Sequence, residues 1–265
     1  MRAFVEGVGV VGPGLRDWAS AREVLAGKAS YQAAPTAVAA SELLPAAERR
    51  RTGLPVKLAL AAGGEAFVGA RRDAAVTATV FASSGGDCDN VHQLCEALAT
   101  PEREVSPTRF HNSVHNVAAG YWSIAMRSRA ASTSLCCHDG SFAAGLLEAA
   151  CQVASEGAPV ALMAYDHPYP EPLNAARPLS AVFGMALVLA PQATDRALAQ
   201  LDIQFVPERA PATRAADPDL EALRGGVPAA RCLPLLSALA RASGETVILE
   251  YVEGAHLRVV VAGCA

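Results

Sequence analysis

The sequence predicts an α/β layered protein, and three observations support this fold class. Segments rich in β-branched residues alternate with segments of helical spacing, a pattern that builds parallel strands joined by right-handed crossovers. Of the 265 residues, 52% are hydrophobic and 18% are charged, which is enough for one large core or two small ones. An alanine-rich helix that is apolar nearly all round is predicted near the middle of the chain, and such a helix is buried.

The first half of the chain shows the alternation most clearly. A strand at Ala3–Val11 ends in the turn sequence GPG, and a helix follows at Leu15–Ala26. After an irregular, proline-containing stretch with a short arginine-rich helical piece, Pro55–Ala70 is a helix that starts with proline. Val76–Ala82 is a strand that ends in SSGGD, followed by a helix at Cys88–Leu98. The glycines of SSGGD match neither GxGxxG nor a P-loop, so a nucleotide site is not expected.

The central segment, SPTRFHNSVHNVAAGYWSIAMRSRAASTSLCCHDGSFAAGLLE, contains two adjacent cysteines before the apolar helix, predicted at Gly140–Ser155. A thiolate at a helix N-terminus is stabilised by unpaired N–H groups and the macrodipole, by up to about 2 kcal/mol. Asp139 in the first turn opposes a negative charge on Cys137, and His138 is expected to point away from Cys137. The alternative is structural: Cys136 and Cys137 are small side chains that fill a tight strand-to-helix turn.

The remaining elements are predicted mainly as apolar strands. Val160–Tyr165 and Ala181–Leu189 follow the central helix. After Pro191 the predicted elements are strands at Leu201–Val206, Val247–Tyr251 and Leu257–Val261 and a helix at Leu233–Ala242.

Charge and cysteine content exclude several classes of function. A net charge of -4 with scattered arginines gives no basic stripe for nucleic acid, although Arg49–Arg51 or the pair Arg71 and Arg72 could meet an acidic carrier protein. The N-terminal apolar run is too short for a signal sequence, and no stretch reaches about 18 apolar residues, so a cytoplasmic protein is expected. The seven cysteines show no CxxC spacing, which favours reduced thiols over disulfides or zinc.

Two parts of the sequence resemble the β-ketoacyl synthases of the thiolase-like superfamily. The opening FVEGVGVVGPGLRDWASAREVLAG is similar to the family's first strand, glycine turn and tryptophan-containing helix. In the central segment Cys137 falls on the family's nucleophile if a three-residue deletion is placed near residues 127–129. The other family positions occupied there are Ser106, Pro107, Asn116, Ala119 and Gly120.

The resemblance, which covers residues 1–189, implies a thiolase-like layered fold that is essentially the first half of a ketosynthase plus a short degenerate second part. In that fold the helix after Cys137 lies between two stacked sheets. We therefore expect a ketosynthase N-terminal-like domain at residues 1–190 and a short C-terminal α/β tail at residues 191–265, packed on the same core. The tail has neither an HGT motif nor a glycine-rich terminal signature.

The resemblance also implies that the two catalytic histidines of the family are missing. After His138 only His167 and His256 remain, and neither has the synthase context. In the family those histidines stabilise the thioester oxyanion and assist malonyl decarboxylation, and losing such donors costs about 2.7 to 4 kcal/mol each. Condensation by this chain alone is therefore not expected. Whether it is an enzyme at all stays open, with Cys137 as the candidate catalytic residue.

The segment RFHNSVHN corresponds to the part of the family that lines the acyl tunnel near the dimer boundary. For His111 and His115, ordinary structural hydrogen bonding is an equal alternative. The residues interpreted as acyl-tunnel or subunit-interface residues are Phe110, His111, His115, Asn116 and Tyr121.

The family offers a precedent for such a chain in the chain-length factor, a non-condensing homologue that pairs with an active synthase. We therefore expect a heterodimer with a full-length β-ketoacyl-ACP synthase in fatty-acid or polyketide biosynthesis of the aryl-polyene or xanthomonadin type, with acyl carrier protein as a further partner. The alternatives are a Cys137-dependent acyltransferase or thioesterase-like enzyme, and a non-catalytic homodimeric module that binds acyl chains or carrier protein. No cofactor or metal is expected, and a truncated layered domain should leave apolar surface for a partner.

Overall fold

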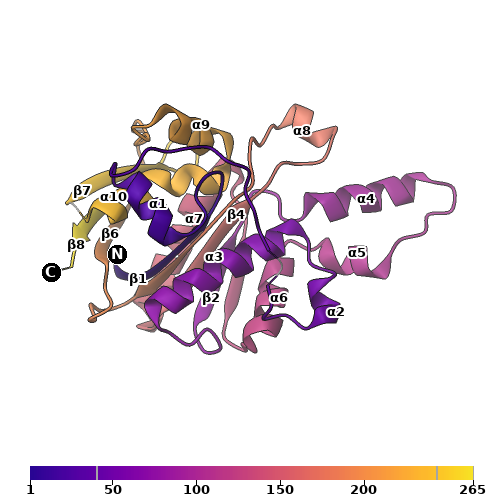
Figure 1. The fold of residues 1–265 in the computed structure, drawn as a ribbon, viewed down its shortest axis with the longest axis horizontal. Coiled ribbons are helices and arrows are strands. Elements are labelled where there is room, and N and C mark those ends of the chain that lie inside the picture. Colours follow the sequence, from indigo (N-terminus) through magenta and orange to yellow (C-terminus); the bar gives the residue numbers. More distant parts are fainter. Residues whose placement is uncertain (40, 243, 265) are drawn as a thin grey trace.

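The computed structural model describes residues 1–39, 41–242 and 244–264, and within them eight strands form one mixed sheet (Figure 1). The order of the strands across the sheet is β3-β2-β4-β5-β1-β6-β8-β7. The strands are β1 (Arg2–Val11), β2 (Ala78–Ala82), β3 (Ser132–Leu135), β4 (Val160–Asp166), β5 (Phe183–Ala190), β6 (Ala199–Val206), β7 (Glu245–Glu250) and β8 (His256–Gly263).

Helices lie on both faces of the sheet, as the α/β fold class predicts. On one face α1, α7, α9 and α10 share a core with the strands, and on the other face α3 and α6 do so. The helices are α1 (Trp18–Leu25), α2 (Ala46–Arg49), α3 (Leu54–Ala70), α4 (Cys88–Ala99), α5 (Pro107–Asn112), α6 (Val117–Met126), α7 (Ser141–Glu156), α8 (Leu173–Ala176), α9 (Pro218–Gly226) and α10 (Leu233–Arg241), with the 3₁₀ turns η1 (His138–Gly140) and η2 (Pro228–Cys232).

Only part of the sheet is parallel, which corrects the expectation from the β-then-α alternation. The strands β3, β2 and β4 are parallel because α6 and α7 carry the chain back between them, whereas every other neighbouring pair is antiparallel. The carboxyl ends of the three parallel strands share one edge, and the two cysteines of the central segment follow β3 there.

Helix α3 packs closely on β1 because two glycines remove side chains from the contact. A Cβ atom on Gly7 would lie 2.0 Å from the carbonyl oxygen of Ala66, and one on Gly9 would lie 1.9 Å from that of Ala62. The Glu65 carboxylate accepts hydrogen bonds from the backbone N–H groups of Val10 and Trp18, so α3 also fixes the turn that follows β1.

Helix α7 is buried as predicted, but it does not lie between two separate sheets. Residues 141–146, Ala149, Ala150 and Val153 are buried, and the side that carries Leu147, Glu148 and Cys151 is partly exposed. Among the described residues the second sheet is absent as a separate unit because β6 pairs with Arg2–Val5 of β1 and thereby extends the first sheet. The side chains of β6, β7 and β8 that point inward join the same core as α7. The domain boundary at residue 190 stays a prediction.

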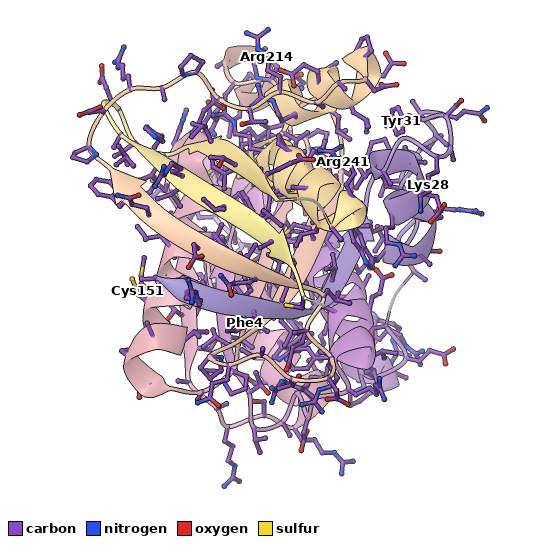
Figure 2. The ribbon with its side chains drawn as sticks, turned by 90° about the vertical axis from the view of Figure 1, so that its left-hand side faces the viewer. Phe4, Lys28, Tyr31, Cys151, Arg214 and Arg241 are labelled. Carbon is purple, nitrogen blue, oxygen red and sulfur yellow. The ribbon has the colours of Figure 1, made fainter. Side chains whose placement is uncertain are left out.

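The outer face of β6 and β8 is turned toward the viewer in Figure 2. Polar side chains pair across this face: Arg258 donates a hydrogen bond to Gln204, and Arg2 forms an ion pair with Asp202. Polar side chains therefore cover part of this sheet face.

Helices α4 and α5 form an arm, residues 88–112, that projects away from the sheet (Figure 1). No residue of α4 is buried. Because a helix in a globular protein normally buries one face, the arm is an element with little support from its own chain. No described helix is long and apolar enough to cross a lipid bilayer.

Candidate functional site

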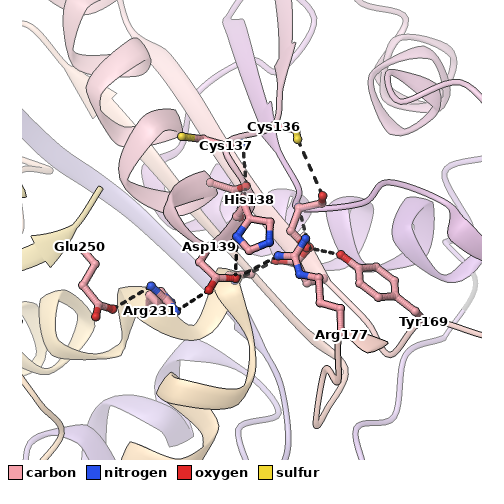
Figure 3. Close-up of polar contacts among 12 residues, drawn as sticks. Cys136, Cys137, His138, Asp139, Tyr169, Arg177, Arg231 and Glu250 are labelled. Atoms are coloured by element: carbon pink, nitrogen blue, oxygen red, sulfur yellow. Dashed lines mark hydrogen bonds and ion pairs between the residues drawn. The ribbon is translucent and has the colours of Figure 1, made fainter. Parts of the chain in front are cut away.

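The two adjacent cysteines lie in a sharp turn, residues 136–140, that we call the cysteine turn (Figure 3). It joins β3 to α7 through η1, and its one left-handed residue is His138, at φ 50°. The backbone N–H of Cys137 donates to the Ser141 hydroxyl (3.0 Å), which in turn donates to the carbonyl of His138 (2.7 Å). The turn is therefore held by the first residue of α7.

Cys137 is half-buried, and its surroundings disfavour the thiolate. Burial raises the pKa of Cys137 above its ordinary value, and the charge of the neighbouring Cys136 raises it further. Asp139, which the sequence suggested would oppose a negative charge, is instead neutralised by two arginines. Its carboxylate accepts hydrogen bonds from Arg177 (2.9 Å) and Arg231 (3.0 Å).

These two arginines belong to a chain of ion pairs that ties the cysteine turn to the C-terminal tail. Arg231 also binds Glu250 of β7 (2.9 Å), and Glu250 binds Arg224 of α9 (3.2 Å). Figure 3 shows this chain running from Arg177 through Asp139 to Glu250. Since the groups alternate in sign, each guanidinium lies beside a carboxylate.

Tyr251, which follows β7, packs directly on the cysteine turn. A Cβ atom on Gly140 would lie 2.5 Å from the carbonyl oxygen of Tyr251, so this position requires glycine. Burial raises the pKa of the Tyr251 hydroxyl, and the charges of Cys137 and Cys151 add to that shift. The tail thus places a backbone carbonyl against Gly140 and an uncharged phenol close enough to Cys137 to be affected by its charge.

No histidine ring makes a hydrogen bond to the Cys137 sulfur in the part of the chain that the structure describes, where all six histidines lie. His138 projects into solvent with its side chain 69% exposed, 3.5 Å from Asp139. The other five contact different groups: His92 with Glu96, His111 with Tyr121, His115 with Ser83, His167 with Asp89, and His256 with Glu208.

Four of the five residues predicted to line a tunnel or interface lie together in a second site, which we call the docking groove. It has a volume of about 560 Å³ and lies between α5 and α6. Phe110 is 66% exposed, and the sequence analysis did not single out two further exposed apolar residues there, Val114 and Ile124. The full lining is Pro107, Phe110, His111, Val114, Asn116, Val117, Gly120, Tyr121 and Ile124.

Helix α2 and its following residues support the groove from behind. The side-chain amide of Asn112 donates to the carbonyl of Arg51 (2.7 Å), and the Tyr121 hydroxyl donates to the side-chain oxygen of Asn112 (3.2 Å). Burial raises the pKa of Tyr121, with the Glu48 carboxylate as a second cause. These contacts hold the uncharged Tyr121 side chain in the wall of the groove.

The structure brings neither His115 nor Cys137 into the docking groove. His115 shares a hydrogen bond with the carbonyl of Ser83 (3.1 Å), beside Gly86 at the end of β2. His115 therefore holds the root of the arm against the sheet. Within the described residues, no group of three or more His, Cys, Asp and Glu side chains is arranged to hold a metal ion.

The strand edge next to the groove is open. Among the strands that the structure describes, β3 is the last on its side of the sheet and pairs only with β2. At the opposite edge Thr213 exchanges hydrogen bonds with Ile248 of β7 and thereby covers that strand. An open strand edge beside exposed apolar side chains is typical of a surface that a partner completes.

A comparison with known protein families identifies the family of the chain. The family described as "Beta-ketoacyl synthase, N-terminal domain" matches residues 17–227. The chain belongs to this ketosynthase family. Among proteins with curated descriptions, no sequence matches it.

Solved structures show that this ketosynthase-family chain has the thiolase-like layered fold. A chain of the ketosynthase ApeO in complex with its chain length factor ApeC, from Xenorhabdus doucetiae, is 19% identical over 98% of this chain and 99% of that one, with a TM-score of 0.74. A chain of the type II complex AntDE:AntF is 13% identical over 99% of each, with a TM-score of 0.75. A chain of the ishigamide ketosynthase/chain length factor is 16% identical over 100% and 99%, with a TM-score of 0.73.

Proposed function

We propose that the chain is a chain-length-factor-like, non-condensing partner of a full-length β-ketoacyl-ACP synthase in polyketide or fatty-acid biosynthesis of the aryl-polyene type. The observation that carries the proposal is the separation of two features. The cysteine turn lacks imidazole support, whereas the docking groove and the β3 edge form an exposed apolar surface. Such a chain is poorly suited to catalyse condensation and well suited to bind a partner protein.

The names of two similar structures support the choice of partner. Both describe a ketosynthase together with a chain length factor. A third describes an acyl-carrier protein in complex with its ketosynthase. For this chain we therefore propose a synthase at the docking groove and β3 edge, an acyl carrier protein that serves the pair, and a cytoplasmic location.

A single substitution in the docking groove tests the proposed interface. Phe110→Asp should abolish co-purification with a full-length synthase from the same gene neighbourhood. Burying a phenylalanine contributes about 1.5 to 3 kcal/mol, and an unpaired carboxylate in its place adds a desolvation cost. Because Phe110 is largely exposed, the variant should unfold at the wild-type temperature.

Val252→Asp is the matched control, since Val252 is 43% exposed in the turn between β7 and β8, away from the arm. It should co-purify with the synthase as the wild type does. Equal co-purification of the two variants would show that the partner binds elsewhere or does not bind.

The alternative enzyme hypothesis is tested at Cys137. In the proposed pair, Cys137→Ser should leave the rate of product formation unchanged, because the synthase supplies the nucleophile. Intact-mass labelling with acyl thioesters should also leave Cys137 unmodified. A stable acyl adduct on Cys137, or loss of product in the Cys137→Ser pair, would favour a Cys137-dependent acyltransferase.

A further inference from the structure

A further pocket lies at the amino ends of the three parallel strands, and the proposed function makes no use of it. Its lining comes from the segments 71–78, 130–131 and 158–159, which lead into β2, β3 and β4, and from Arg196 in the loop after β5. The cysteine turn follows the carboxyl end of β3, so the two sites lie at opposite ends of these strands. The pocket has a volume of about 500 Å³, and we call it the arginine pocket.

Two arginines of this pocket are held on one buried carboxylate, that of Glu6. The register of β1 against β5 shifts at Glu6, as in a β-bulge, and such a shift re-aims a side chain. Arg72 donates hydrogen bonds to both carboxylate oxygens, through Nε and Nη2, and the Thr194 hydroxyl donates to one of them (2.6 Å). Burial alone would raise the pKa of Glu6, but the hydrogen bonds from Arg72 and Thr194 lower it on balance. The carboxylate is therefore ionised at neutral pH.

The guanidinium group of Arg196 is only partly paired. Its Nη2 lies 3.9 Å from the Glu6 carboxylate, and its Nε is buried without a hydrogen-bond partner among the described residues. The backbone N–H of Arg196 donates to the Thr194 hydroxyl oxygen (3.2 Å), so the loop fixes the point from which the side chain extends. Because a buried donor needs an acceptor and Glu6 is already engaged by Arg72, the missing acceptor is a bound ion or water.

The charges of the lining favour an anion as that acceptor. The charged lining residues are Arg71, Arg72, Asp73 and Arg196, so three guanidinium groups face one carboxylate. That carboxylate accepts a hydrogen bond from the backbone N–H of Ala75 (2.8 Å) in its own turn. Three charged residues close to the lining in sequence, Arg129, Glu156 and Asp195, are exposed, so water and salt screen them.

The rest of the lining is largely apolar and leaves room for more than a bare ion. Val76 is 76% exposed, and Ala130, Ala131 and Pro159 continue the wall. An apolar pocket with a few convergent polar groups is the usual form of a small-molecule site. A guanidinium fork matches the spacing of phosphate oxygens. We propose that the arginine pocket binds a small organic phosphate, with the phosphate group on Arg196 and on the Nη1 group of Arg72 and the organic part against the apolar wall.

Calorimetric titration of the full chain tests this site, in a buffer free of phosphate and sulfate. Phenyl phosphate should bind more tightly than inorganic phosphate, and phenol, which lacks the anion, should show no binding. Arg196→Gln should weaken phenyl phosphate binding at least about tenfold, because a charged donor is lost. Arg209→Gln is the matched control: Arg209 is 74% exposed and pairs with Glu253, so this variant should bind as the wild type does. Arg72 is left unchanged because its loss would strip Glu6 of its main partner.

A second pair of variants at the rim keeps the test independent of the folding of Arg196→Gln. Because Val76 is largely exposed, Val76→Asp and Val76→Asn should both fold, and they differ in charge but hardly in size. Val76→Asp should weaken phenyl phosphate binding several-fold more than Val76→Asn, since a carboxylate repels the anion.

Three results would overturn the inference. Wild-type chain that binds neither phosphate in the millimolar range would show that the pocket holds water only. Equal binding by the two Val76 variants, or by folded Arg196→Gln and Arg209→Gln, would place the anion elsewhere. Phenyl phosphate that binds no more tightly than inorganic phosphate would remove the organic part of the ligand. Because the titration contains no synthase, none of these results bears on the proposed heterodimer.

Discussion

At the residue scale, the thiol of Cys137 is subject to two opposing effects. The start of a helix favours a thiolate, but burial and the adjacent Cys136 together raise the pKa of Cys137. The second effect prevails even though Arg177 and Arg231 neutralise the Asp139 carboxylate in the same turn, because among the described residues no imidazole bonds to the sulfur and stabilises a thiolate. We therefore infer that Cys137, which the sequence resemblance assigns to the family's nucleophile position, is a poorly activated thiol.

This predicts slow alkylation of Cys137. In a Cys136→Ser background at pH 7.5, iodoacetamide should modify Cys137 several-fold more slowly than Cys95, which is exposed on α4. A raised pKa lowers the thiolate fraction by about tenfold per unit. The rate of Cys137 alkylation should therefore rise with pH at values above the ordinary pKa of a cysteine. Peptide mass spectrometry measures both rates in one sample. Alkylation of Cys137 that is faster than alkylation of Cys95, with an inflection in its pH profile below the ordinary pKa of a cysteine, would contradict the assignment of Cys137 as a poorly activated thiol.

The sequence could identify the cysteine turn but not the residues that hold it. Two cysteines before an alanine-rich helix form a local pattern, and the structure has the predicted strand-to-helix turn there. Arg177 and Arg231 reach Asp139 from 38 and 92 residues away. No local spacing reports such contacts, which depend on how the tail packs against the turn.

At the element scale, the contact between α3 and β1 sets the position of one helical layer. The contact depends on Gly7 and Gly9, whose missing side chains let the helix backbone approach the strand. The sequence predicted both elements from their periodicity, at Ala3–Val11 and Pro55–Ala70. It did not predict the close approach, because a glycine in a strand has several structural causes.

Paired glycine substitutions test this contact. Gly9→Ala should destabilise the protein by about 3 kcal/mol or more, since its Cβ atom would overlap the Ala62 carbonyl oxygen. Gly64→Ala on α3 should stabilise it by about 0.5 to 1 kcal/mol, because nothing lies near the added methyl group and alanine favours a helix. Urea unfolding gives both values. Similar midpoints for the two variants would show that α3 does not pack on β1 as described.

Element prediction was weakest where a helix is short and polar. Helix α9 was not predicted, although Asp217 caps it and Pro218 opens it. Those two residues are a recognised start signal, but the following sequence has too few apolar residues to give a clear period. Long apolar segments such as β4, β5 and α7 were predicted to within two residues because burial imposes a strong pattern on them.

At the scale of the whole molecule, one edge of the sheet is covered by the chain itself and the other edge is left open. The C-terminal strands extend the sheet from β1, and Thr213 covers the outer edge of β7. At the other end β3 is open, α4 is unburied and the docking groove exposes Phe110. The sequence predicted an exposed apolar surface for a partner. The family resemblance pointed to Phe110, His111, Asn116 and Tyr121, which lie in the groove. It did not single out Val114 and Ile124, because spacing alone does not tell which side of a helix meets the core.

The most direct test of the proposed function is native mass spectrometry of the chain co-expressed with a full-length β-ketoacyl-ACP synthase. We predict a complex that contains one copy of each protein and persists on dilution through the micromolar range. Separate proteins at every concentration, with the synthase fully active alone, would contradict the proposal that this chain is its partner.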